Sequence, residues 1–101
     1  MDRHRWRLDG QLALVTGGSA GIGRAIAREL LGFGADVVIV ARDGDALETA
    51  REELLEEFPD GQVRGLIGDV ADDEQRREIL DWVADQGRGL NILVNNAGGN
   101  L

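Results

Sequence analysis

The sequence contains no cysteine, and its single histidine is His4, near the N-terminus. Without cysteine the chain can form neither a disulfide framework nor a thiolate metal site, and a lone histidine argues against a histidine-based metal centre. No apolar run approaches the roughly 18 residues needed to cross a membrane, and the charged start of the chain lacks the apolar segment of a secretory signal. We therefore expect a cytoplasmic protein with no metal ion and no membrane contact.

Tyrosine and lysine are also absent, and serine occurs once, at Ser19. The chain is acidic, with 11 basic residues against 19 acidic ones and a net charge of −8. Nucleic-acid binding needs clustered cations that face the phosphate backbone, so the charge balance argues against a nucleic-acid partner. The simplest reading of the net charge is that it keeps the protein soluble.

The length of 101 residues allows one domain at most, or part of one. Hydrophobic residues make up 43% of the chain, which is enough to build a core. Residues 1–10 form a polar lead-in that ends in a turn at Asp9 and Gly10. No linker or low-complexity tract divides the rest, so we expect residues 1–101 to belong to a single domain.

Four short apolar runs are predicted to be strands. Continuous apolar runs are typical of strands that are buried on both faces of a parallel sheet. Three of the runs are clear and one is weaker, because Arg64 and Gly65 interrupt it. The runs occupy residues 12–15, 37–40, 63–67 and 90–94.

Three amphipathic stretches between these runs are predicted to be helices. The first begins at Gly21 and carries apolar residues at helical spacing, namely Ile22, Ile26, Leu30 and Phe33. The second covers residues 46–58, after a loop with capping potential at 42–45. The third runs to about residue 86, and Asp72 with Gln75 resembles a capping box at its start.

Strictly alternating strands and helices predict an α/β fold with right-handed crossovers. We expect a partial, Rossmann-like doubly wound parallel sheet of four strands and three helices, with the spatial strand order 3-2-1-4. The first two helices would cover one face of the sheet and the third the other. The fourth strand would then lie at an open edge.

The stretch 15–23 is a glycine-rich turn between the first strand and the first helix. The amino end of a helix carries unpaired N–H groups and a partial positive charge, and glycines let the backbone approach a pyrophosphate closely. With a second strand about 20 residues on, this context favours dinucleotide binding over a merely structural turn.

The end of the second strand indicates which dinucleotide is bound. An acidic residue there would bind both ribose hydroxyls and repel a 2′-phosphate. The strand instead ends at Ala41, followed by Arg42, whose guanidinium can bind a phosphate bidentately. We therefore expect NADP(H) rather than NAD(H). Two readings stay open: Arg42 could be a solvated loop residue, and Asp43 or Asp45 could bind a ribose.

Three motifs in order resemble the short-chain dehydrogenase/reductase family. Residues 16–23 match the family's T-G-x-x-x-G-[IL]-G signature, Asp69 and Val70 stand where the family keeps an Asp beside the adenine, and residues 95–98 match its N-N-A-G motif. Residues 5–10 and 90–98 are most similar to the tropinone reductase-like branch.

The resemblance implies a role for each matching residue. Gly17, Gly21 and Gly23 would line the pyrophosphate, with Ile22 in the same motif, and Ser19 and Ala20 would lie in the same loop near the adenosine phosphate. Members that prefer NADP often carry a basic residue at the place of Ala20, so more of the 2′-phosphate recognition would fall on Arg42. The remaining implied cofactor contacts are Asp69 and Val70 at the adenine, Asn95 steadying the central strand, and Ala97 and Gly98 at the ribose.

Family members transfer hydride between nicotinamide and a small ketone or alcohol, using a Tyr, a Lys and a Ser that follow the N-N-A-G motif. This chain ends three residues after Gly98 and contains no Tyr or Lys. We expect the cofactor-binding half of an NADP(H)-dependent reductase, inactive on its own, whose full-length form takes a small carbonyl substrate and is a homo-oligomer. The alternatives are a non-catalytic dinucleotide-binding module and an inert truncated product.

Overall fold

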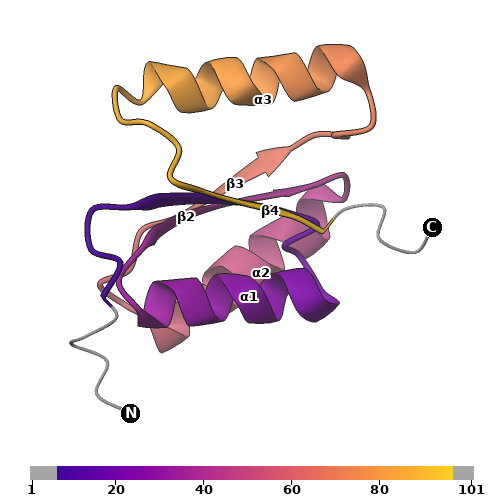
Figure 1. Ribbon diagram of the computed structural model, residues 1–101. Helices are drawn as coiled ribbons and strands as arrows, with labels where there is room; N and C mark the ends of the chain where they lie inside the picture. The colour runs from indigo at the N-terminus through magenta and orange to yellow at the C-terminus, as the bar shows by residue number, and fades with distance from the viewer. Residues whose placement is uncertain (1–6, 97–101) are drawn as a thin grey trace.

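The computed structural model describes residues 7–96 (Figure 1). Strands and helices alternate along the chain as predicted, and each element overlaps its predicted range. The elements in chain order are β1 (Leu12–Thr16), α1 (Gly21–Gly32), β2 (Asp36–Ala41), α2 (Gly44–Glu57), β3 (Val63–Ile67), α3 (Asp73–Asp85) and β4 (Ile92–Asn95). None of the helices in this part of the chain is both long enough and apolar enough to cross a membrane.

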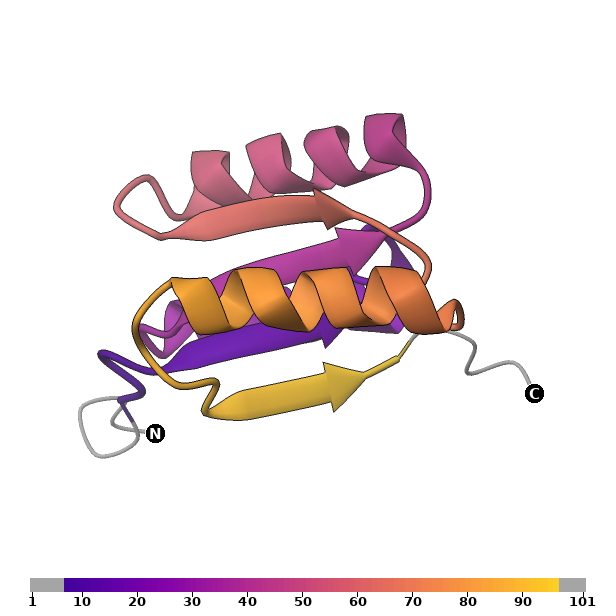
Figure 2. The ribbon, with the colours of Figure 1, turned by 90° about the horizontal axis from the view of Figure 1, so that it is seen from above.

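The strands form one parallel sheet in the order β3-β2-β1-β4, which confirms the predicted order. Figure 2 shows the four strands running in one direction, with β3 and β4 at opposite edges. Val15 of β1 is in register with Ile39 of β2 and with Val94 of β4. All four carboxyl ends therefore lie at the same edge of the sheet, where open α/β sheets bind ligands.

Helices cover both faces of the sheet. Figure 1 shows α1 and α2 on one side and α3 on the other, as predicted. Alternate residues of β1 enter two separate apolar clusters, with Val15 among the residues facing α1 and α2 and Leu14 among those facing α3. All five residues of β1 are buried, because this central strand has a strand on each side and a helix layer above and below.

The buried face of α1 differs from the one that the apolar spacing indicated. The residues packed against the sheet are Gly23, Ala27 and Leu31, whereas Ile22 is 71% exposed. The physical reason is close packing: a Cβ at position 23 would collide with the carbonyl of Gly17. Small residues let the helix approach the sheet, so the contact face is one position away from the face of large apolar residues.

Polar contacts at the amino edge of the sheet fix the position of β4. Arg88 pairs with Asp36 at 2.5 Å and donates to the Gly10 carbonyl at 2.7 Å. Asn91 accepts from the Leu12 N–H at 2.8 Å through Oδ1 and donates its own N–H to the Leu12 carbonyl at 3.0 Å. The loop before β4 is thereby tied to the starts of β1 and β2, which sets where β4 ends at the opposite edge.

Candidate functional site

A groove with a volume of about 1210 Å³ lies at the carboxyl ends of the strands. It brings together segments that are far apart in the sequence: the glycine turn after β1, the end of β2, the loop after β3 and the end of β4. The lining residues are Gly17, Ser19, Ala20, Gly21, Ile22, Val40, Ala41, Arg42, Asp43, Gly68, Asp69, Val70, Ala71, Asn95 and Asn96.

The predicted site residues within 7–96 converge on this groove, with the exception of Gly23. Gly23 is buried in the first turn of α1, where a Cβ would meet the Gly17 carbonyl and lie 2.8 Å from Nδ2 of Asn96. The structure thus places Gly23 under the glycine turn, in close helix–strand packing, rather than on the groove surface. Ala97 and Gly98, also predicted as cofactor contacts, lie outside the described residues.

The glycine turn has a backbone that other residues adopt only with strain. Gly17 has a φ of 70° and Gly21 a φ of 60°. The Gly17 N–H donates to the Val40 carbonyl at 2.7 Å, which fastens the turn to the end of β2. A Cβ on Gly21 would meet nothing within 4 Å, so open space adjoins the backbone where α1 begins.

The amino end of α1 differs from those of the other two helices. Asp43 caps α2 and Asp72 caps α3, and both of these helices have acidic residues in their first turns. Helix α1 begins after Ala20, with no side-chain cap and no acidic residue in its first turn. No described side chain therefore accepts hydrogen bonds from the first N–H groups of α1 or offsets the positive end of its dipole. The amino end of α1 lines the groove, so this arrangement favours binding of an anion there.

Arg42 follows the end of β2 and supplies a positive charge to the lining of the groove. Its side chain is exposed, and within residues 7–96 it has neither a hydrogen-bond partner nor an ion-pair partner. The neighbouring Asp43 lines the groove too, but its Oδ1 accepts from the N–H groups of Asp45 and Ala46 at 3.0 and 3.1 Å. Asp45 is not among the lining residues.

The loop after β3 forms a third wall. Asp69 accepts the Ala71 N–H at 2.9 Å through Oδ1, and Val70 and Ala71 line the groove beside it. The predicted capping box at the start of α3 is only half formed. Asp72 accepts the Gln75 N–H at 3.0 Å as expected, but the Gln75 side chain accepts from the Asp69 N–H instead of the N–H of Asp72.

The buried hydroxyl of Thr16 joins the ends of β1 and β4. Its oxygen accepts the Asn96 N–H at 2.9 Å and lies 3.3 Å from the Val94 carbonyl and 3.2 Å from Oδ1 of Asn95. Thr16 is 4% exposed, so this is a buried polar contact in an otherwise apolar strand. Asn95 thus contacts the central strand β1 through its side chain.

Two residues of the turn have structural tasks that sequence reasoning missed. The Thr16 hydroxyl was visible only as one letter of a motif, yet it holds the two strand ends together. Gly18 is the other, because a Cβ there would lie 2.7 Å from a side-chain carbon of Ile39. The only available signal was the position of both residues between a strand and a glycine turn.

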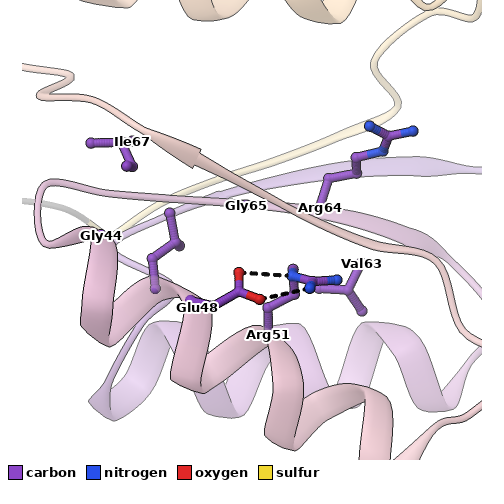
Figure 3. Close-up of a pocket in the computed structure, with 8 residues that line it drawn as sticks. Gly44, Glu48, Arg51, Val63, Arg64, Gly65 and Ile67 are labelled. Carbon is purple, nitrogen blue, oxygen red and sulfur yellow. Dashed lines mark hydrogen bonds and ion pairs between the residues drawn. The ribbon is translucent and has the colours of Figure 1, made fainter.

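A smaller pocket of about 370 Å³ lies between α2 and the edge strand β3, away from the predicted site (Figure 3). Glu48 and Arg51 pair on its wall at 2.7 Å. The hydrogen bond from Arg51 lowers the pKa of the Glu48 carboxyl, and the same bond raises the pKa of Arg51. Both charged groups therefore stay ionised and paired at neutral pH, which suits a surface ion pair rather than an acid or a base.

No cluster of three or more His, Asp or Glu side chains that could hold a metal ion occurs within residues 7–96. The groove lining offers backbone N–H groups, the guanidinium of Arg42, which has no partner within residues 7–96, and the carboxylates of Asp43 and Asp69.

The family model for short chain dehydrogenase matches residues 11–101. A tropinone reductase homologue of Arabidopsis thaliana is 45% identical over 103 residues, which cover 96% of this chain and 36% of that protein. Chloroplastic chlorophyll(ide) b reductase NOL of Oryza sativa subsp. japonica is 37% identical over 87 residues, covering 86% of this chain and 25% of that protein. The chain spans about a third of the length of the tropinone reductase homologues that it matches.

Solved structures share the fold at similar identity. One of them is an NADPH-bound short chain oxidoreductase from Pseudomonas aeruginosa PAO1 with an atypical catalytic centre. It is 40% identical to this chain, with a TM-score of 0.86, and the match covers 91% of this chain and 36% of that one. L-sorbose reductase from Gluconobacter frateurii, complexed with NADPH and L-sorbose, is 40% identical with a TM-score of 0.84, over 91% of this chain and 35% of that one.

Proposed function

The chain belongs to the short-chain dehydrogenase/reductase family, with tropinone reductase-like relatives, and on this premise we propose that its groove binds NADP(H). The observation that carries the proposal is that two features favourable to anions belong to the lining of one groove. The amino end of α1 has no acidic cap, and Arg42 has no partner among the described residues. Together they form a site for a ligand with two separate anionic groups.

Each segment of the groove lining would contact a different part of the dinucleotide. The pyrophosphate would lie on the turn formed by Gly17, Ser19, Ala20 and Gly21, where the open space next to Gly21 leaves room for phosphate oxygens. Gly23 would serve the same turn from below, by letting α1 pack closely. Ile22, which is exposed on the groove, would contact the cofactor through its apolar side chain.

The other end of the groove would hold the adenosine. Asp69 and Val70 would flank the adenine, and Arg42 would bind the 2′-phosphate. Capping α2 occupies Oδ1 of Asp43, so this carboxylate has one oxygen left for a ligand and cannot offer both oxygens to the two ribose hydroxyls, as an acid that selects NAD(H) would. Ala97 and Gly98 would pass close to the adenosine ribose, and Asn95 would steady the central strand through its contact with Thr16.

We further propose that residues 1–101 are the N-terminal, cofactor-binding part of one Rossmann domain. The full-length protein would be an oxidoreductase that acts on a small ketone or alcohol, and it would function in the cytoplasm as a homo-oligomer. Bound NADPH supplies the hydride in this chemistry. The 101 residues contain no Tyr and no Lys, so they offer no proton donor of the family's kind and are expected to be inactive alone. The alternative is that the chain itself binds a dinucleotide without catalysis.

The test is a fluorescence titration of the full chain with NADPH and with NADH. We expect the wild-type chain to bind NADPH more tightly than NADH. Arg42→Gln should weaken NADPH binding by about 10- to 100-fold, because a charge-assisted contact to the 2′-phosphate is lost, and should change the affinity for NADH little. Arg77→Gln is the matched control. Arg77 is also an exposed arginine without an ion-pair partner in the described part of the chain, but it lies on α3 and does not line the groove. Equal effects of the two substitutions would refute the assignment of Arg42.

A further inference from the structure

The β3–α3 loop, residues 68–72, is held at both of its ends by backbone hydrogen bonds. The Gly68 N–H donates to the Ala41 carbonyl at 3.0 Å, which joins the loop to the end of β2. The Asp72 N–H donates to the Asp69 carbonyl at 3.1 Å, which closes the loop on itself before α3. Between these two anchors lie the loop residues that line the groove, Asp69, Val70 and Ala71.

Two side chains from the first turn of α3 hold the middle of the loop. Oε1 of Gln75 accepts the Asp69 N–H at 2.8 Å. Nη1 of Arg76 donates to the Val70 carbonyl at 2.9 Å. The first bond restricts the peptide group that precedes Asp69, and the second restricts the peptide group that follows Val70. The backbone that carries the Asp69 carboxylate is therefore held from α3 on both sides of the Asp69–Val70 pair.

The Gln75 contact does nothing for the helix that carries it. Asp72 alone accepts the N–H of Gln75 at the helix start. In a capping box the Gln side chain would bind the N–H of the cap residue, but here it binds a residue three positions earlier, outside α3. Its structural effect is therefore on the groove wall.

The Asp69 carboxylate is thus oriented by its neighbours. Its Oδ1 accepts the Ala71 N–H at 2.9 Å. Its other oxygen has no hydrogen-bond partner in the described part of the chain and is available to a donor in the groove. An ionised carboxylate only accepts hydrogen bonds, so it favours a base that presents an amino group and disfavours one that presents a carbonyl.

We propose that Gln75 is a positioning residue for purine selectivity: by holding the Asp69 N–H, it aims the Asp69 carboxylate so that the groove prefers adenine over hypoxanthine. The inference rests on the proposed NADP(H) binding. It predicts that selectivity between the two bases depends on a side chain that does not itself line the groove.

The experiment compares the affinity of the full chain for NADPH and for its hypoxanthine analogue, which carries an oxo group in place of the adenine amino group. Gln75→Leu removes the acceptor for the Asp69 N–H, and Gln75→Glu retains one. Gln86→Leu is the matched control, because Gln86 lies at the other end of α3 and donates to the Trp82 carbonyl of its own helix. Thermal unfolding of each variant checks that it is folded.

We expect the wild type to prefer NADPH, and Gln75→Leu to reduce that preference by about tenfold, the equivalent of one hydrogen bond, chiefly through weaker NADPH binding. Gln75→Glu and Gln86→Leu should keep the wild-type ratio. If the wild type binds neither nucleotide, the proposed function fails and this inference fails with it. If the wild type discriminates and Gln75→Leu retains the ratio, or weakens both nucleotides equally, only the role of Gln75 is refuted.

Discussion

Substitution of Gly21 by alanine should impair dinucleotide binding far more than it impairs folding. Gly21 has a φ of 60°, and alanine in this left-handed region costs about 1–2 kcal/mol. A Cβ at this position would meet no atom within 4 Å, so no steric cost adds to the backbone strain. The new methyl group would, however, occupy the open space of the groove where phosphate oxygens need to approach the backbone.

Two other glycines provide matched controls for the backbone strain. Gly10 has a φ of 80° and Gly87 a φ of 73°, and a Cβ on either would also meet nothing within 4 Å. Neither residue lines the groove. The variants Gly10→Ala, Gly21→Ala and Gly87→Ala should therefore each lose about 1–2 kcal/mol of stability, while only Gly21→Ala should lose affinity for NADPH.

Urea unfolding with and without NADPH separates the two effects. At a ligand concentration of 100 times Kd, a protein that binds only in its folded state gains about 2.7 kcal/mol. A variant that binds tenfold more weakly gains about 1.4 kcal/mol at the same NADPH concentration. Gly21→Ala should show this smaller increment, and the two controls the full one. An undiminished increment in Gly21→Ala, or an equal reduction in all three variants, would refute the placement of phosphate at this turn.

Substitutions at three further positions test packing and electrostatics. Gly23→Ala should lower the urea midpoint and cost about 1–3 kcal/mol through overpacking, because its Cβ would strike a backbone carbonyl; an unchanged or higher midpoint would contradict this. Thr16→Val should lower the free energy of unfolding by about 1–3 kcal/mol, because it leaves a hydrogen-bonding partner of the hydroxyl unpaired. Thr16→Ser should cost less, because it keeps the hydroxyl and loses only a methyl group worth about 0.8 kcal/mol. If urea unfolding ranks the two variants the other way, Thr16 does not join the strands through its hydroxyl. Glu48→Gln should lower the melting temperature at about pH 7, because the pKa of Glu48 is lowered in the folded state and its ionised form stabilises the fold above its ordinary pKa of 4.5. The deficit should shrink as the pH falls below 4.5 and through the folded-state pKa. A deficit that stays constant across this range would show that the ion pair with Arg51 is not its source.

The sheet could be predicted from the sequence because its signals are local and redundant. The runs at β1 and β2 are continuously apolar, and short connections with intervening helices leave few topologies open. The packing face of α1 could not be predicted in the same way. The hydrophobic periodicity of the sequence is dominated by large apolar residues such as Ile22. The helix instead packs on the sheet through Gly23 and Ala27, because these small residues allow a close approach.

The site was predictable where a backbone conformation demands a residue type, as at Gly17 and Gly21. It was less predictable where a side chain selects one of several possible partners. Gln75 had a local partner in the capping-box pattern, yet it binds the N–H of Asp69, and only the path of the loop determines that choice. The contact between Thr16 and Asn96 joins residues far apart in sequence, so it follows from the pairing of β1 with β4 rather than from either segment alone.

The distribution of charge explains how so acidic a chain could accept a polyanionic cofactor. The net charge is −8, yet no Asp or Glu occurs between residues 10 and 28, the stretch that forms β1, the glycine turn and most of α1. Arg24 and Arg28 of this helix pair with Glu53 and Glu57 of α2, so these cations bind the neighbouring helix rather than the groove. Charges further away than about 8 Å are largely screened at physiological ionic strength. A phosphate on the glycine turn therefore meets no acidic residue from β1, the turn or the start of α1, and the net negative charge of the whole chain does not exclude a dinucleotide.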